Sequence, residues 1–130
     1  MPTPRPSDLE MQVLAILWEH GPATVRQVQE ALPDGKARAY TTVLTVLQVM
    51  EKKGLLCHSR RGLSHVFQPQ VSRESVVQPL LGDLVRKVFG GRRLAAVQCL
   101  LEGDDLDADD LKAAQRLLAQ AQRRSREGKG

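Results

Sequence analysis

The sequence YTTVLTVLQVMEKKGLL, residues 40–56, changes from a helical to an extended pattern at its glycine. Its apolar residues repeat at the spacing of one buried helix face, which predicts a helix from about Arg38 to Lys53; they are Val43, Val46, Leu47 and Met50. Gly54 suits the position just after a helix end, and the two lysines before it favour the negative end of the helix dipole. We therefore predict a helix followed directly by a strand.

The polar residues of this predicted helix also share one face. They are spaced i, i+4, i+7 and i+11, and Arg38 extends the face toward the N-terminus; the four are Thr41, Thr45, Gln48 and Lys52. Hydroxyls, an amide and cations are the groups that meet phosphates and base edges in a major groove of DNA. No carboxylate interrupts the face, whereas a solvated helix face usually mixes both signs of charge. On spacing alone, such a solvated amphipathic helix remains the alternative.

Two shorter helices are predicted before this one and a strand pair after it. Ser7 with Glu10, and Thr24 with Gln27, are predicted capping boxes at the two earlier helix starts. Leu55–Arg60 and His65–Gln68 are predicted strands, with Arg60-Arg61-Gly62-Leu63 at the hairpin tip. Trp18 is expected to anchor the first helix against this hairpin. Three helices followed by a hairpin with a basic tip is the order of a winged helix-turn-helix.

The second half of the chain is predicted to be helical. Pro79 either lies in the first turn of a helix or kinks a longer one begun at Ser72. Asp107 is predicted to cap the last helix, and the basic segment from Arg123 to Gly130 is expected to fray. One broad apolar face is the candidate dimerisation surface; it consists of Leu80, Leu81, Leu84, Val85, Val88 and Phe89. A two-fold partner would cover this face, and burial against the first half of the chain is the alternative.

Composition limits the function further. The chain has 130 residues, of which 42% are hydrophobic and 26% charged, and this length and composition are typical of one globular domain. Its net charge of +4 permits a nucleic-acid partner without requiring one. The few aromatic residues argue against a single-strand stacking platform. Cys57 and Cys99 form no CxxC pair, so we expect no disulfide scaffold, no metal site and no cofactor. No apolar run approaches a membrane span, no nucleophile–base set indicates an enzyme, and the cytoplasm is the expected location.

Several stretches resemble the penicillinase-repressor family of bacterial regulators, the BlaI/MecI/CopY group. They are LEMQVLAILWEHG at 9–21, ATVRQVQEAL at 23–32, YTTVLTVLQVMEKKGLL at 40–56 and VFQP at 66–69, with a weaker match through VFGG at 88–91 and LLE at 100–102. The resemblance implies a dimeric repressor with an N-terminal winged helix and a C-terminal dimerisation region. It also implies inverted-repeat operators, often with TACA/TGTA half-sites.

The resemblance further implies how such a repressor is released from DNA. In several relatives a membrane sensor triggers proteolysis at an Asn-Phe pair, and the equivalent pair here is about Cys99-Leu100, where neither residue matches. This departure argues against cleavage at this site, but not against repression. The copper-responsive members carry a cysteine-rich C-terminal motif, whereas this chain has no cysteine after Cys99.

We therefore predict a mainly α fold with a small β-hairpin: a winged helix-turn-helix DNA-binding domain over residues 1–70 and a helical dimerisation region over 71–130. The predicted function is a homodimeric, sequence-specific repressor that binds double-stranded DNA at an inverted-repeat operator. The alternative is a winged-helix protein-interaction module without specific DNA binding. Candidate DNA contacts are Thr24, Lys36, Arg38, Tyr40, Thr41, Thr42, Thr45, Arg60 and Arg61. The threonines of the third helix would touch bases, Thr24 a phosphate, and the cations mostly backbone.

Overall fold

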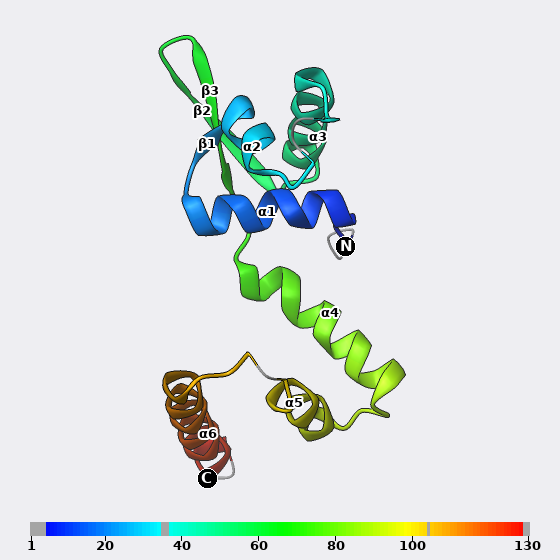
Figure 1. Cartoon of the computed structure of the whole chain (residues 1–130), viewed down its shortest axis with the longest axis vertical. Coiled ribbons are helices and arrows are strands. Elements are labelled where there is room, and N and C mark those ends of the chain that lie inside the picture. Colours follow the sequence, from blue (N-terminus) through cyan, green and yellow to red (C-terminus); the bar gives the residue numbers. More distant parts are fainter. Residues whose placement is uncertain (1–4, 35–36, 104, 129–130) are drawn as a thin grey trace. The chain divides into compact units, whose positions relative to one another are not determined.

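The computed structural model describes residues 5–34, 37–103 and 105–128. It confirms a mainly helical chain with a small antiparallel sheet. In chain order the elements are α1 (Asp8–His20), β1 (Ala23–Thr24), α2 (Val25–Ala31), α3 (Tyr40–Lys52), β2 (Leu56–Arg61), β3 (Ser64–Pro69), α4 (Arg73–Val88), α5 (Arg93–Leu101) and α6 (Ala108–Gly128) (Figure 1).

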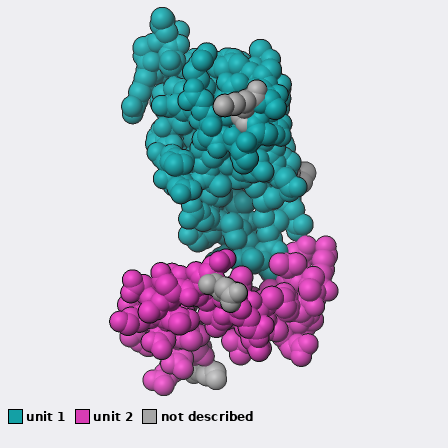
Figure 2. All heavy atoms as spheres, viewed as in Figure 1, with its two compact units in different colours: residues 1–81 teal, residues 82–130 magenta. Residues whose placement is uncertain are grey.

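The chain divides into two compact units, and the division falls inside α4 (Figure 2). The first unit covers Met1–Leu81 and the second Gly82–Gly130. The first half of α4 therefore belongs to the compact unit that contains the helix-turn-helix. The separation of function at residue 70 stays a prediction, because compactness does not say which residues bind DNA.

Both predicted capping boxes are present and set the starts of the first two helices. The Ser7 hydroxyl accepts the Glu10 N–H at 3.2 Å, and the Glu10 carboxylate accepts the Ser7 N–H at 2.9 Å. Thr24 and Gln27 make the same reciprocal pair at 3.2 and 2.9 Å. Each box satisfies two backbone donors that the first turn of a helix leaves without an intrahelical partner.

The end of α3 explains why a strand follows it at once. Gly54 has φ +82°, the left-handed conformation that glycine adopts without steric cost. The Gly54 N–H donates to the Glu51 carbonyl and the Leu55 N–H to the Met50 carbonyl, both at 3.0 Å. This pair of bonds is a Schellman motif, and the buried side chains of Met50 and Leu55 supply its apolar contact. The chain thus turns from α3 directly into β2.

The sheet has three antiparallel strands in the order β1-β3-β2. The hairpin strands are Leu56–Arg61 and Ser64–Pro69, so each begins or ends one residue away from the predicted limits and the tip shortens to Gly62-Leu63. Gly62, with φ +61°, makes this two-residue turn possible. The sequence does not predict β1, because two residues are too few for a periodic signal; the pairing of Ala23 with Phe67 appears only in three dimensions.

The core lies between α1, α2, α3 and the sheet. From α3 it takes Val43, Leu47 and Met50, each at most 2% exposed, as the helical spacing predicted. Phe67 of β3 is the largest fully buried side chain. Trp18 packs against this core, which includes Leu56 and Phe67 of the hairpin. Its indole N–H also donates to the carbonyl of Val71 at 3.0 Å, so it joins α1 to the segment just before α4 as well.

The second half of the chain consists mainly of the helices α4, α5 and α6. Pro79 lies inside α4, which settles its predicted placement in favour of a helix that begins well before it. The Asp107 side chain accepts the Asp110 N–H at 2.8 Å and caps α6, as predicted. The structure corrects the expected fraying for the described part of this segment: α6 continues from Arg123 to Gly128, because the intervening Arg, Ser and Glu residues include no proline or internal glycine. The last two residues of the segment, 129 and 130, lie outside the described residues.

Candidate nucleic-acid interface

The exposed face of α3 is the centre of the candidate interface. Thr41, Thr45, Gln48 and Lys52 are all exposed, on the side of the helix opposite its buried residues. This arrangement agrees with the projection from the sequence. It presents two hydroxyls, an amide and an ammonium group in one row, which matches the donors and acceptors of a major groove.

The Thr45 side chain makes a hydrogen bond within its own helix. Its hydroxyl donates to the carbonyl of Thr41 at 2.8 Å. The side chain therefore presents to a ligand the acceptor lone pairs of its oxygen and its methyl group. Such a side chain can accept a hydrogen bond from a base amino group or contact a thymine methyl.

The N-terminal end of α3 has no side-chain cap. Ala39 occupies the N-cap position and makes no side-chain hydrogen bond to the first turn. Tyr40, 45% exposed, and the exposed Thr41 and Thr42 follow it. The positive end of the helix dipole thus lies beside three exposed hydroxyl groups, which can donate to a phosphate oxygen or reach a base edge.

Arg38 is held in an ion pair just before α3. Its Nε donates to Asp34 Oδ1 at 2.9 Å and its Nη2 lies 2.8 Å from Oδ2. The hydrogen bond from Arg38 lowers the pKa of the Asp34 carboxyl, and the same bond raises the pKa of the guanidinium. Gln29 also donates to the Arg38 carbonyl at 2.7 Å and fixes the backbone there. The sequence projection placed Arg38 on a face free of carboxylates, whereas the structure adds Asp34 to its surroundings.

A groove of about 530 Å³ separates α3 from the hairpin tip. It is lined by Thr24 and the first turn of α2, by a stripe of α3 that shares Gln48 with the polar face, and by the hairpin. The lining residues are Thr24, Val25, Arg26, Tyr40, Leu44, Gln48, Leu63, Ser64 and His65. None of these described residues is acidic, and Arg26 adds a cation. The shape and charge of this groove suit a strand of the sugar-phosphate backbone.

The two arginines of the hairpin lie on opposite faces of it. Arg60 pairs with His65 and Arg61 with Ser64, and consecutive residues of a strand alternate sides. The face with Arg60 and His65 is also the face of His58, whose imidazole contacts the Glu51 carboxylate of α3 and stacks on His65 with ring centroids 4.7 Å apart. Arg60 therefore shares the α3 side of the hairpin, and Arg61 projects away from it.

The remaining predicted contacts have different surroundings. Thr24 lines the groove, where its hydroxyl oxygen accepts the Gln27 N–H and its hydroxyl proton remains able to donate to a phosphate oxygen. Lys36 lies outside the described residues. The sequence pattern does not predict that Arg26, Leu63 and His65 line the groove. The periodicity of one helix cannot reveal them, because they come from two other elements.

Two further observations concern the rest of the described chain. Over residues 5–34, 37–103 and 105–128, no group of three or more histidine, cysteine, aspartate or glutamate side chains could hold a metal ion. No helix among these residues is long and apolar enough to cross a membrane.

Two of the solved structures that are similar to this chain come from BlaI repressors. One is the solution structure of the DNA-binding domain of the repressor BlaI, with a TM-score of 0.49, 27% identity, and coverage of 56% of this chain and 89% of that chain. The other is the Bacillus licheniformis BlaI monomeric form in complex with the blaP half-operator, with a TM-score of 0.48 and the same identity and coverage.

Comparison with curated sequences covers more of the chain. A transcriptional regulator BlaI of Mycobacterium tuberculosis is 40% identical over 118 residues, which is 89% of this chain and 84% of that protein. The penicillinase repressor of Bacillus licheniformis is 23% identical over 124 residues, 95% of this chain and 97% of that protein. The family is one of repressors and not of enzymes, in agreement with the sequence prediction. Since the sequence model of the penicillinase repressor family matches residues 6–120, this chain belongs to the penicillinase repressor family.

Proposed function

We propose that this chain is a DNA-binding transcriptional repressor that binds an inverted-repeat operator as a homodimer in the cytoplasm. The observation that carries the proposal is the exposed polar face of α3, which lies beside a groove with no acidic residue among its described lining. The names of the relatives, a transcriptional regulator and a penicillinase repressor, support the same function. In this arrangement α3 enters the major groove and the hairpin follows the adjacent backbone.

The roles within the interface divide by chemistry. Thr41, Thr42 and Thr45 are proposed base contacts because their short side chains lie on the exposed face of α3. Arg60 and Arg61 are proposed phosphate contacts, with Arg60 on the α3 side of the hairpin and Arg61 on the other. Arg26, beside Thr24 at the groove, is a third phosphate contact that the structure adds.

The homodimer is proposed from the helices of the second half. No residue of α4, α5 or α6 is buried within the single chain. Their large apolar side chains are exposed to an extent that a stable monomer seldom shows, with Leu84 at 50%, Val88 at 65% and Leu94 at 76%. A two-fold partner would bury such a surface and place two α3 helices about one DNA turn apart, roughly 34–36 Å.

A membrane sensor-protease pathway is a separate proposal for release from DNA. It would act on α5, whose exposed Cys99 and Leu100 stand where some relatives carry the cleaved pair. Incubation of the protein with membranes from induced cells tests it: a cut within α5 supports the pathway, and an intact chain under conditions that relieve repression argues against it.

A gel-shift titration with the promoter fragment of its own gene, repeated across salt concentrations, tests the repressor. We expect tight binding, competition only by fragments that contain the operator, and a steep loss of affinity with salt. Micromolar binding with no preference over random DNA would contradict the proposal and favour a protein-interaction module.

The same assay separates base contacts from backbone contacts. Thr45→Ala should weaken binding to the operator most and binding to random DNA little. Arg60→Ala together with Arg61→Ala should weaken binding to all sequences and make the salt dependence shallower by about one to two phosphate contacts. Equal losses in both variants on both DNAs would contradict this division of roles.

A further inference from the structure

Trp18 ties the first turn of α4 to α1. Its indole N–H donates to the Val71 carbonyl at 3.0 Å, and the Arg73 guanidinium lies over its ring, with Cζ 5.6 Å from the ring centroid. Val71 precedes α4 and Arg73 is its first residue. A hydrogen bond and a cation–π contact on one indole thus fix where α4 leaves the part of the chain from α1 to β3, which we call the winged half.

The connection before α4 has little freedom of its own. Pro69, the last residue of β3, is paired with Leu56, and the Gln70 N–H donates to the Leu55 carbonyl at 2.8 Å. The Ser72 hydroxyl accepts the Ser75 N–H at 3.1 Å and starts the helix. Only residues 70–72 separate the sheet from α4, so the direction of the helix depends on what holds its first turns.

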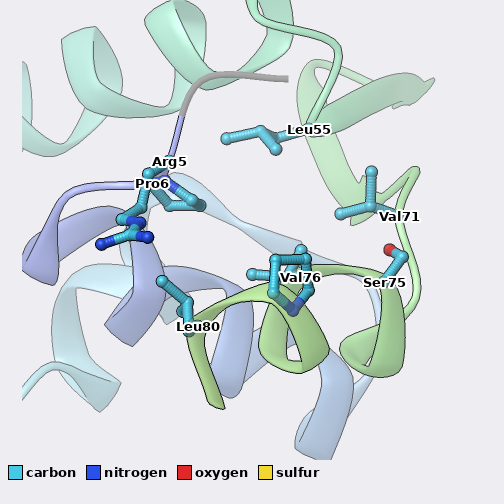
Figure 3. A pocket seen from close by; sticks show the side chains of 8 residues that line it. Arg5, Pro6, Leu55, Val71, Ser75, Val76 and Leu80 are labelled. Atoms are coloured by element: carbon cyan, nitrogen blue, oxygen red, sulfur yellow. The ribbon is translucent and has the colours of Figure 1, made fainter. Parts of the chain in front are cut away.

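Apolar packing alone leaves space beneath these turns. A cavity of about 280 Å³ lies between the first half of α4 and the winged half (Figure 3). Leu55, Pro6 and Arg5 line one side, and Val71, Ser75, Val76, Pro79 and Leu80 line the other. Val71 and Val76 pack against the buried core while they remain partly exposed, and the contacts of Trp18 restrict the helix in addition to this packing.

We propose that Trp18 is a positioning residue that sets the half-site spacing this repressor accepts. This inference rests on the proposed homodimer. Because α4 continues from the winged half into the second unit, the direction of its first turns decides where each α3 lies relative to a two-fold axis. One inserted base pair moves a half-site by roughly 3.4 Å and rotates it by roughly 35°, so a rigid junction rejects changed spacings and a loosened one accepts them.

The test compares wild type with Trp18→Phe, which keeps an apolar ring but removes the N–H donor. An inverted repeat is first selected with wild type from random duplexes, and duplexes are then made with one and two base pairs added or removed at its centre, and with one half-site alone. Wild type should lose at least about tenfold in affinity with each change of spacing. The affinity of Trp18→Phe should change by less than about threefold between spacings. This variant should bind the selected spacing several-fold more weakly than wild type does, and should bind the single half-site as tightly as wild type does.

A second pair of variants keeps the test decisive if Trp18→Phe does not fold. Arg73→Gln removes the cation over the ring, and Arg86→Gln removes the same charge from the same helix at a position away from Trp18. Only Arg73→Gln should relax the spacing preference. An unchanged spacing profile in Trp18→Phe or Arg73→Gln, or an equal loss on every duplex including the half-site, would overturn the inference. Failure of wild type to select any inverted repeat would instead contradict the proposed function.

Discussion

At the scale of single residues, the charges of the winged half are paired in ways that the net charge does not reveal. Arg38 is bound by Asp34 in two contacts, and Lys53 is bound by Glu10 across the fold, with Nζ 3.1 and 2.9 Å from the two carboxylate oxygens. The first pair is exposed and stands beside the candidate DNA interface. The second involves a glutamate that is only 5% exposed. We therefore expect the exposed pair to affect DNA binding and the buried pair to affect the stability of the fold.

Asp34→Asn should strengthen DNA binding. The change frees the Arg38 guanidinium for a phosphate and removes a negative charge, so affinity for operator and random duplexes should rise by about three- to tenfold and the salt dependence should steepen by about one contact. Gel-shift titration at several salt concentrations measures both. Glu19→Gln removes the same charge from α1 and serves as the control; it should change neither the affinity for DNA nor its salt dependence. Weaker binding by the Asp34→Asn variant would show that the ion pair positions the start of α3 and that Arg38 is not a DNA contact.

Glu10 should make stability depend on acid pH. Burial raises the pKa of its carboxyl, but the hydrogen bonds from the Ser7 N–H and Lys53 and the charge of Lys53 outweigh burial, so the pKa lies below its ordinary value of 4.5. A lowered pKa in the folded state stabilises the fold above the unfolded value, and this stabilisation disappears as pH falls from 4.5 through the folded value.

Urea unfolding between pH 3 and 7 measures this dependence. Glu10→Gln should lower the free energy of unfolding by about 1–3 kcal/mol near neutral pH and flatten its decline below about pH 5. Glu19→Gln, at an exposed glutamate of the same helix, should leave the pH profile unchanged. A wild-type acid profile in the Glu10→Gln variant would rule out this carboxylate as the cause.

At the scale of elements, α3 and the hairpin form the interface because of how α3 ends. The Schellman motif at Gly54 reverses the chain within a few residues and brings β2 alongside α3. The Glu51–His58 contact then joins the end of the helix to the hairpin. The groove depends on this turn, since its two walls are α3 and the hairpin tip.

Substitution of Gly54 by Ala should destabilise the winged half by about 1–2 kcal/mol, because an L side chain at φ +82° is strained. Asn tolerates the left-handed conformation better, so Gly54→Asn should cost about half as much. Urea unfolding followed by circular dichroism compares the two. Equal costs for Ala and Asn would mean that the lost stability does not come from backbone strain.

At the scale of the whole molecule, the two halves of the chain differ in how far they bury their apolar side chains. The winged half buries a core of leucines, valines, Met50 and Phe67, whereas the helices of the second half leave most of their leucines exposed. This contrast is expected of a chain in which one half folds alone and the other folds against a second copy.

Leu84→Glu and Val88→Glu should shift the protein from dimer to monomer, with at least about a tenfold rise in the dissociation constant for each charge buried in an apolar interface. Sedimentation velocity over a range of concentrations measures this constant. Leu63→Glu places the same charge at the exposed hairpin tip and should leave the dimer intact. A wild-type sedimentation profile in both α4 variants would show that these side chains lie outside the subunit interface.

Much of the local structure follows from the sequence alone. Capping boxes, the Gly54 turn, the buried stripe of α3 and its polar face all depend on residues within a few positions of one another, so their spacing predicts them. Family membership also follows from the sequence, through stretches that cover most of the chain. The helix α6 extends further than its polar, basic end suggests, because arginine and glutamate are good helix formers.

Other features depend on contacts between residues distant in sequence, which no local pattern records. The strand β1 exists because Ala23 and Thr24 lie beside β3, and the groove contains Arg26 and His65 because three elements meet there. Trp18 could be predicted as an anchor from its size, but its partners at Val71 and Arg73 could not, since 53 residues separate it from the carbonyl it binds. Spacing thus determined which helices this protein forms and which faces they bury; tertiary structure alone decided which side chains share the groove and how α4 is held, because these depend on distances between elements.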